Sequence, residues 1–102
     1  GLRHAFTYYG ITVSHNSVSG ITASKLKSLL DQHPEGIVLY CGKIPHAVFV
    51  TRYSGDTFYC ADPLSGYSGS ERKLSSSYLG KKYGSQAKIL SNTTAYWYVS
   101  KY

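Results

Sequence analysis

The fold of this chain is decided by residues 44–63, which read IPHAVFVTRYSGDTFYCADP. Two runs rich in β-branched and aromatic residues flank a Ser-Gly-Asp turn, a pattern that predicts a β-hairpin. If the loop is the three residues 54–56, Val48 lies opposite Asp62, and His46 shares a face with Asp62 diagonally across the hairpin. The two side chains are then within reach of an imidazole–carboxylate hydrogen bond. A loop of two residues sends them to opposite faces, so the pairing requires an odd loop or a bulge.

The pairing of His46 with Asp62 has a chemical interpretation and a structural one. A carboxylate that binds one imidazole nitrogen fixes the tautomer and leaves the other nitrogen as a general base beside a nucleophile. In the structural interpretation, a histidine at the start of a strand and an Asp-Pro turn occur independently, since each is common alone. The spacing by itself favours the structural interpretation.

The chain before the hairpin is predicted to be mainly helical. Apolar residues at helical spacing indicate the tail of one helix over residues 2–9 and a second helix over residues 22–33. The second helix ends before Pro34, because the residue preceding a proline is disfavoured in the helical conformation. Between the helices, residues 11–13 alternate as a short strand and residues 15–20 have the composition of a turn.

The remainder of the chain is predicted to be mostly antiparallel strands. Residues 37–41 form a continuous apolar run typical of a buried strand. After the hairpin come a surface loop at residues 64–70, one or two helical turns at residues 75–82, and strands at residues 88–90 and 95–99. This order of elements indicates an α+β protein of one domain, or a truncated portion of one, with residues 1–34 mainly helical and residues 36–102 forming an antiparallel sheet.

Four segments within this pattern resemble a known family. They are GIVLY (36–40), PHAVFVTRY (45–53), GDTFY (55–59) and ADP (61–63). In this order and at these spacings they resemble the papain-like cysteine peptidases of the bacteriocin-processing, double-glycine leader group, over about residues 20–65. The resemblance implies a papain-like fold without a cofactor, in which His46 is the catalytic base and Asp62 orients it.

The chain departs from the family pattern at the nucleophile. In that family a cysteine opens a helix well before the histidine, with a glutamine just upstream, whereas this chain has no cysteine before Cys41. The resemblance therefore implies an incomplete papain-like fold that carries the histidine and the aspartate, with the nucleophile upstream in the full protein or on another chain. Cys41 and Cys60 fall on strands two places apart, roughly 10 Å from each other. That separation is too large for a disulfide, so we expect two buried free thiols.

The resemblance implies hydrolysis of peptide bonds in a peptide or protein substrate, although the 102 residues alone are expected to be inactive. An alternative is a non-catalytic module of the same fold that binds peptides. A third is a basic domain that binds an anionic surface, since the formal net charge is +6. The basic residues are mostly scattered singly, however, and only Arg72-Lys73 and Lys81-Lys82 are adjacent, so we do not expect a nucleic-acid partner.

Composition and spacing bear on cofactors, membrane insertion and location. The histidines at positions 4, 15, 33 and 46 are far apart and no Cys-x-x-Cys pair is present, so we expect no metal site. No apolar run is long enough to span a membrane. Eleven tyrosines and abundant serine and threonine are typical of an exported protein, which favours a secreted or cell-surface bacterial location. A lobe that lacks its mate would expose apolar surface, so self-association is a further expectation.

Overall fold

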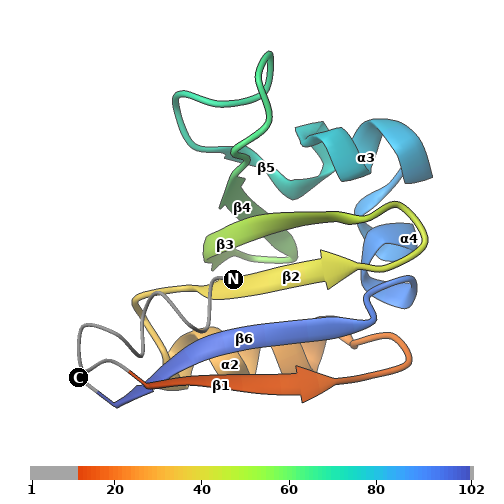
Figure 1. Ribbon diagram of the computed structural model, residues 1–102. Coiled ribbons are helices and arrows are strands. Elements are labelled where there is room, and N and C mark those ends of the chain that lie inside the picture. Colours follow the sequence, from red (N-terminus) through yellow and green to blue (C-terminus); the bar gives the residue numbers. More distant parts are fainter. Residues whose placement is uncertain (1–11, 102) are drawn as a thin grey trace.

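The computed structural model describes residues 12–101 as a single antiparallel sheet with helices packed against it (Figure 1). The sheet has six strands in the order β1-β6-β2-β3-β4-β5. The strands are β1 (Thr12–Ser17), β2 (Ile37–Cys41), β3 (His46–Ser54), β4 (Thr57–Ala61), β5 (Arg72–Lys73) and β6 (Ala95–Lys101). The helices are α2 (Ala23–Gln32), α3 (Tyr78–Tyr83) and α4 (Gln86–Ser91), and a 3-10 turn, η1, covers Leu74–Ser76. The predicted α+β class is confirmed.

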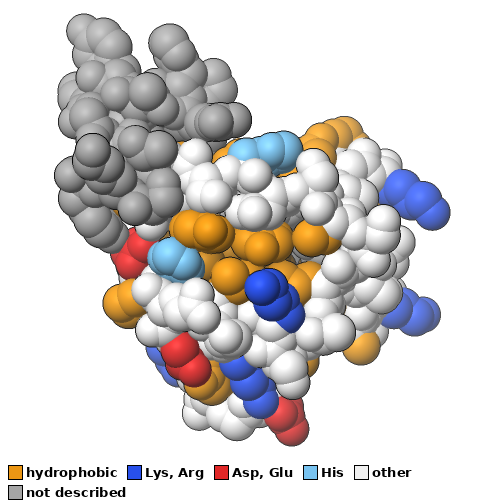
Figure 2. Space-filling view, turned by 90° about the horizontal axis from the view of Figure 1, so that it is seen from below, with side chains coloured by type: hydrophobic (Ala, Val, Ile, Leu, Met, Phe, Trp, Pro, Cys, Tyr) orange, Lys and Arg blue, Asp and Glu red, His pale blue; other side chains and the backbone are white. Residues whose placement is uncertain are grey.

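The core lies on one face of the sheet. In β2, residues 37, 39 and 41 are buried while the two residues between them are only partly buried, which is the alternation expected of a strand with one face in the core. All three helices bury their apolar residues in the same cluster, and α2 and α4 lie behind the sheet in Figure 1. Seen from below, Lys and Arg side chains lie apart from one another around a central apolar area (Figure 2). Within residues 12–101, no helix is long and apolar enough to cross a membrane.

The predicted helix over residues 22–33 is confirmed as α2. Thr22 is its N-cap, and the Thr22 side chain accepts a hydrogen bond from the backbone N–H of Lys25. The strands predicted at 37–41 and 95–99 are also confirmed, as β2 and as part of β6. The helix predicted at residues 2–9 lies outside the described residues.

Two predictions about local structure are wrong. Residues 88–90 were expected to be a strand, but they lie in α4, where Ser85 caps the helix by accepting from the N–H of Lys88. Three apolar or amphipathic residues cannot distinguish a strand from one helical turn by periodicity. The turn expected at 15–20 is also too long, because residues 15–17 belong to β1 and pair with β6.

The hairpin of β3 and β4 has the register that the pairing of His46 with Asp62 requires, and a β-bulge produces it. Its loop has two residues, Gly55 and Asp56, because Ser54 pairs with Thr57, so of the two routes to the pairing the structure does not use the three-residue loop. The register then shifts at Thr51, which is an extra residue in β3 and forms a β-bulge. Beyond the bulge Phe49 pairs with Ala61. Continued by one residue, this register places Val48 opposite Asp62.

Candidate active site

The structure brings His46 and Asp62 into direct contact. His46 is the first residue of β3, and Asp62 directly follows β4. The distance from Nε2 of His46 to Oδ1 of Asp62 is 2.8 Å. The side chain of His46 is 13% exposed and that of Asp62 is 0% exposed, so this hydrogen bond is largely shielded from water. The predicted pairing of the two side chains is confirmed, while their catalytic roles remain a prediction.

Asp62 is held by three hydrogen-bond donors from three parts of the chain. Besides His46, the backbone N–H of Leu64 donates to Oδ1 at 3.0 Å, and the backbone N–H of Tyr78 donates to Oδ2 at 2.9 Å. Burial alone would raise the pKa of Asp62, but these hydrogen bonds and the nearby imidazole outweigh it and lower the pKa below its usual value. The carboxylate is therefore ionised at neutral pH.

The ionised carboxylate determines the tautomer of His46. A carboxylate is only an acceptor, so the Nε2 atom of His46 carries the proton in this bond. In the neutral imidazole, Nδ1 then has the free lone pair and is the nitrogen able to take a proton from a nucleophile. The ring of Tyr78 packs edge-on against the imidazole, with centroids 5.1 Å apart and an angle of 69° between the planes.

Local packing explains why α3 presents the N–H of Tyr78 to Asp62. Ser77 is buried and is the N-cap of α3, and its Oγ accepts from the N–H of Gly80 at 3.2 Å. The same hydroxyl donates to the carbonyl of Leu74 at 2.7 Å, which joins η1 to α3. The sequence analysis missed Tyr78 as a residue of the site. A serine followed by a short helical run indicated the start of a helix. Sequence alone could not show that the first residue of this helix lies against Asp62.

Neither cysteine has the properties of a nucleophile. Cys41 and Cys60 are both free and fully buried, as predicted. Burial raises the pKa of the Cys41 thiol. Burial, with a further contribution from the charge of Asp62, raises the pKa of Cys60 to about 12. Both side chains are therefore protonated at neutral pH and out of reach of a substrate.

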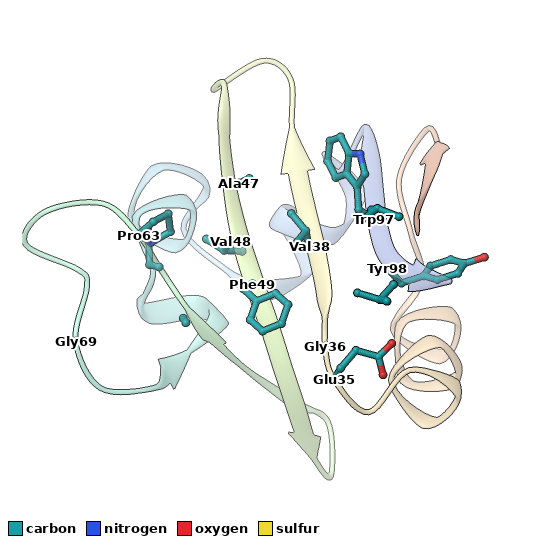
Figure 3. Close-up of a pocket in the computed structure, with 14 residues that line it drawn as sticks. Glu35, Gly36, Val38, Ala47, Val48, Phe49, Pro63, Gly69, Trp97 and Tyr98 are labelled. Atoms are coloured by element: carbon teal, nitrogen blue, oxygen red, sulfur yellow. The ribbon is translucent and has the colours of Figure 1, made fainter. Parts of the chain in front are cut away.

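An apolar pocket of about 630 Å³ lies on the face of the sheet opposite the core. His46 does not line it, because its side chain is on the core face, opposite the buried Cys41. Ala47 lines it near the start of β3 and Glu35 lines it just before β2 (Figure 3), and Asp62 also contributes to its wall. Between them the walls are mainly apolar side chains of β2, β3 and β6, including Val38, Phe49 and Trp97. Among the residues whose burial is described, Phe49 is the one large apolar side chain that is exposed, at 38%.

Other binding chemistry can be judged for the part of the chain that the structure describes. Among residues 12–101, no group of three or more His, Cys, Asp or Glu side chains could hold a metal ion. Glu35 in the wall of the pocket lies 3.6 Å from Nδ1 of His33, and the His33 ring stacks on Tyr98 at 3.9 Å between centroids.

Comparison of the chain with protein-family models gives no match, and comparisons with curated proteins and with solved structures give none either. The candidate site is therefore interpreted from its own geometry.

Proposed function

We propose that this chain is the histidine- and aspartate-bearing part of a papain-like cysteine peptidase. His46 is the general base and then the general acid, and Asp62 orients it. The observation that carries the proposal is the 2.8 Å hydrogen bond between His46 and a buried, ionised carboxylate that is itself fixed by two backbone N–H groups. A general base needs its tautomer and direction fixed, and a carboxylate that is itself held in place does both.

In this mechanism Nδ1 of His46 takes the proton from a cysteine thiol, and the thiolate attacks the carbonyl carbon of the scissile peptide bond. The imidazolium, stabilised by Asp62, then gives the proton to the leaving amine as the carbon–nitrogen bond breaks. The product is a thioester and a free amine. Water, deprotonated by His46, hydrolyses the thioester, which releases the acid and restores the thiol.

The nucleophile of this reaction is supplied by a part of the full protein upstream of these residues, or by another chain. The apolar pocket supports the presence of a further segment, because its walls contain few polar groups and Phe49 is left exposed in it.

A non-catalytic module that binds peptides is the second candidate. The observation that favours it is the combination of a preformed apolar pocket with two cysteines that are both fully buried. In that case an extended peptide occupies the pocket and no bond is broken. The two candidates differ in whether a reactive thiol exists beside His46.

The test uses the full-length parent protein, iodoacetamide as the thiol probe, and a peptide library as substrate. We expect one cysteine outside these 102 residues to be alkylated rapidly at neutral pH. The variant His46→Ala should lower peptide hydrolysis by about 10²–10⁴-fold. The exposed His15 provides the matched control, and His15→Ala should leave hydrolysis unchanged.

Two results would overturn the proposal that the full protein is a peptidase. One is peptide binding by a full-length protein that has no reactive cysteine, which would support the binding module. The other is hydrolysis by the isolated 102-residue chain that depends on Cys41 or Cys60.

A further inference from the structure

Tyr78 contacts both members of the His46–Asp62 pair by different means. Its backbone N–H donates to Oδ2 of Asp62 at 2.9 Å, on the carboxylate oxygen that His46 does not use. Its ring meets the imidazole edge-on at 5.1 Å between centroids. The two contacts come from one residue, so the position of α3 fixes the carboxylate and the imidazole together.

The ring of Tyr78 is itself held on other sides. Tyr67, from the loop that follows Asp62, packs edge-on against it with centroids 5.8 Å apart. Lys82, one helical turn further along α3, places its Nζ atom 5.3 Å from the centre of the ring. Such contacts favour one orientation of an aromatic ring. The imidazole therefore rests against a ring whose own movement is restricted.

We propose that Tyr78 is a positioning residue for His46. One hydrogen bond to Asp62 does not prevent the imidazole ring from rotating about the bond that joins it to Cβ. Nor does it prevent the proton on Nε2 from exchanging with water. The ring of Tyr78 closes one side of the imidazole, which limits rotation and keeps water from the Nε2–H group. The backbone N–H of Tyr78 keeps Asp62 in line as the acceptor. Nδ1 is then maintained as the basic nitrogen. The proposal rests on the role given to His46 in the proposed function.

The test measures the imidazole directly, on the 102-residue chain labelled with ¹⁵N-histidine. Nitrogen chemical shifts report the tautomer of His46, and line broadening reports exchange of the Nε2-bound proton with water. We expect Tyr78→Phe to keep the Nε2–H tautomer and slow exchange, because the ring remains. We expect Tyr78→Ala to accelerate exchange at least tenfold and to populate the second tautomer, although its backbone N–H is still present.

A matched control separates this effect from a general loss of packing. Tyr59 lies on the same hairpin and packs 3.8 Å from the guanidinium of Arg52. Tyr59→Ala should therefore leave the His46 signals unchanged. The proposal is overturned if folded Tyr78→Ala, checked by its amide spectrum, has the wild-type tautomer and exchange rate. It is also overturned if Tyr78→Phe behaves like Tyr78→Ala.

The ¹⁵N measurements on His46 require no catalysis, so the positioning role of Tyr78 and the peptidase function can fail separately. If the parent protein proves inactive while Tyr78→Ala releases the imidazole, the positioning role stands and the peptidase fails. In an active parent protein, Tyr78→Ala should lower kcat with little change in KM, and Tyr78→Phe should restore it.

Discussion

Asp62 is a buried carboxylate that keeps its charge at neutral pH, so we expect it to make the stability of the fold depend on pH. Its pKa is lower in the folded protein than the ordinary value, which applies to the unfolded chain. Ionisation of Asp62 therefore stabilises the folded protein. This stabilisation is complete above the pKa of Asp62 in the unfolded chain, about 3.9. The effect is lost as the pH falls through the lower, folded pKa.

The variant Asp62→Asn tests this linkage. We expect the free energy of unfolding of the variant to lie below that of the wild type at neutral pH, and the difference to shrink as the pH falls below about 4. Urea unfolding at a series of pH values measures it. If the two proteins lost stability in parallel on acidification, the charge of Asp62 would not be the cause.

Gly80 shows how a residue inside a short helix can be constrained by its neighbours. A Cβ atom at this position would lie 2.1 Å from the carbonyl oxygen of Ser75, which is backbone and cannot move aside easily. Alanine normally stabilises a helix interior relative to glycine by about 1 kcal/mol. Here we expect Gly80→Ala to destabilise the protein by about 1–3 kcal/mol instead.

The exposed Lys81, next along α3, is the control for Gly80→Ala, and Lys81→Ala should change the free energy of unfolding by less than about 0.5 kcal/mol. Thermal unfolding of both variants gives the comparison. Stabilisation by Gly80→Ala would show that Ser75 yields to the new side chain.

At the scale of elements, the bulge at Thr51 gives the hairpin its register. On the turn side Arg52 pairs with Tyr59, and on the site side Val50 pairs with Cys60. Removal of Thr51 would make these two pairs consecutive in an uninterrupted ladder. The apolar residues of both strands would then keep their faces, and so would His46 and Asp62.

We therefore expect deletion of Thr51 to leave the His46–Asp62 hydrogen bond intact, while the hydrogen bond from the Thr51 hydroxyl to Glu71 is lost. By contrast, one alanine inserted between Ala47 and Val48 should turn His46 to the opposite face and abolish the bond. The ¹⁵N shifts of His46 distinguish the outcomes. A deletion variant that resembled the insertion variant would contradict this account of the register.

The hairpin illustrates what sequence can and cannot predict about an element. The alternation of side chains and the Gly-Asp turn located β3 and β4, and the spacing required an odd loop or a bulge to join His46 to Asp62. Sequence could not choose between them, because a three-residue loop and a two-residue loop with a bulge give the same register at the site. For residues 88–90 the failure has a different cause, since three residues contain too little periodicity.

At the scale of the whole molecule, long-range pairing was the unpredictable part. β6 lies between β1 and β2 in the sheet, although more than fifty residues separate it in sequence from each of them. No local pattern specifies that arrangement. The same holds for Tyr78, which reaches Asp62 from a separate helix. His46 and Asp62, which were predicted for the site, belong to one hairpin, whereas Tyr78, which was missed, belongs to α3.

The backbone amides that hold Asp62 have a consequence for how the site can be observed. The N–H groups of Leu64 and Tyr78 exchange with solvent deuterium only when their bonds to the carboxylate open. Because one carboxylate accepts both, protonation of Asp62 or its withdrawal would release the two amides together. Their exchange rates would therefore record the opening of the site in a resting protein, without substrate and without a nucleophile.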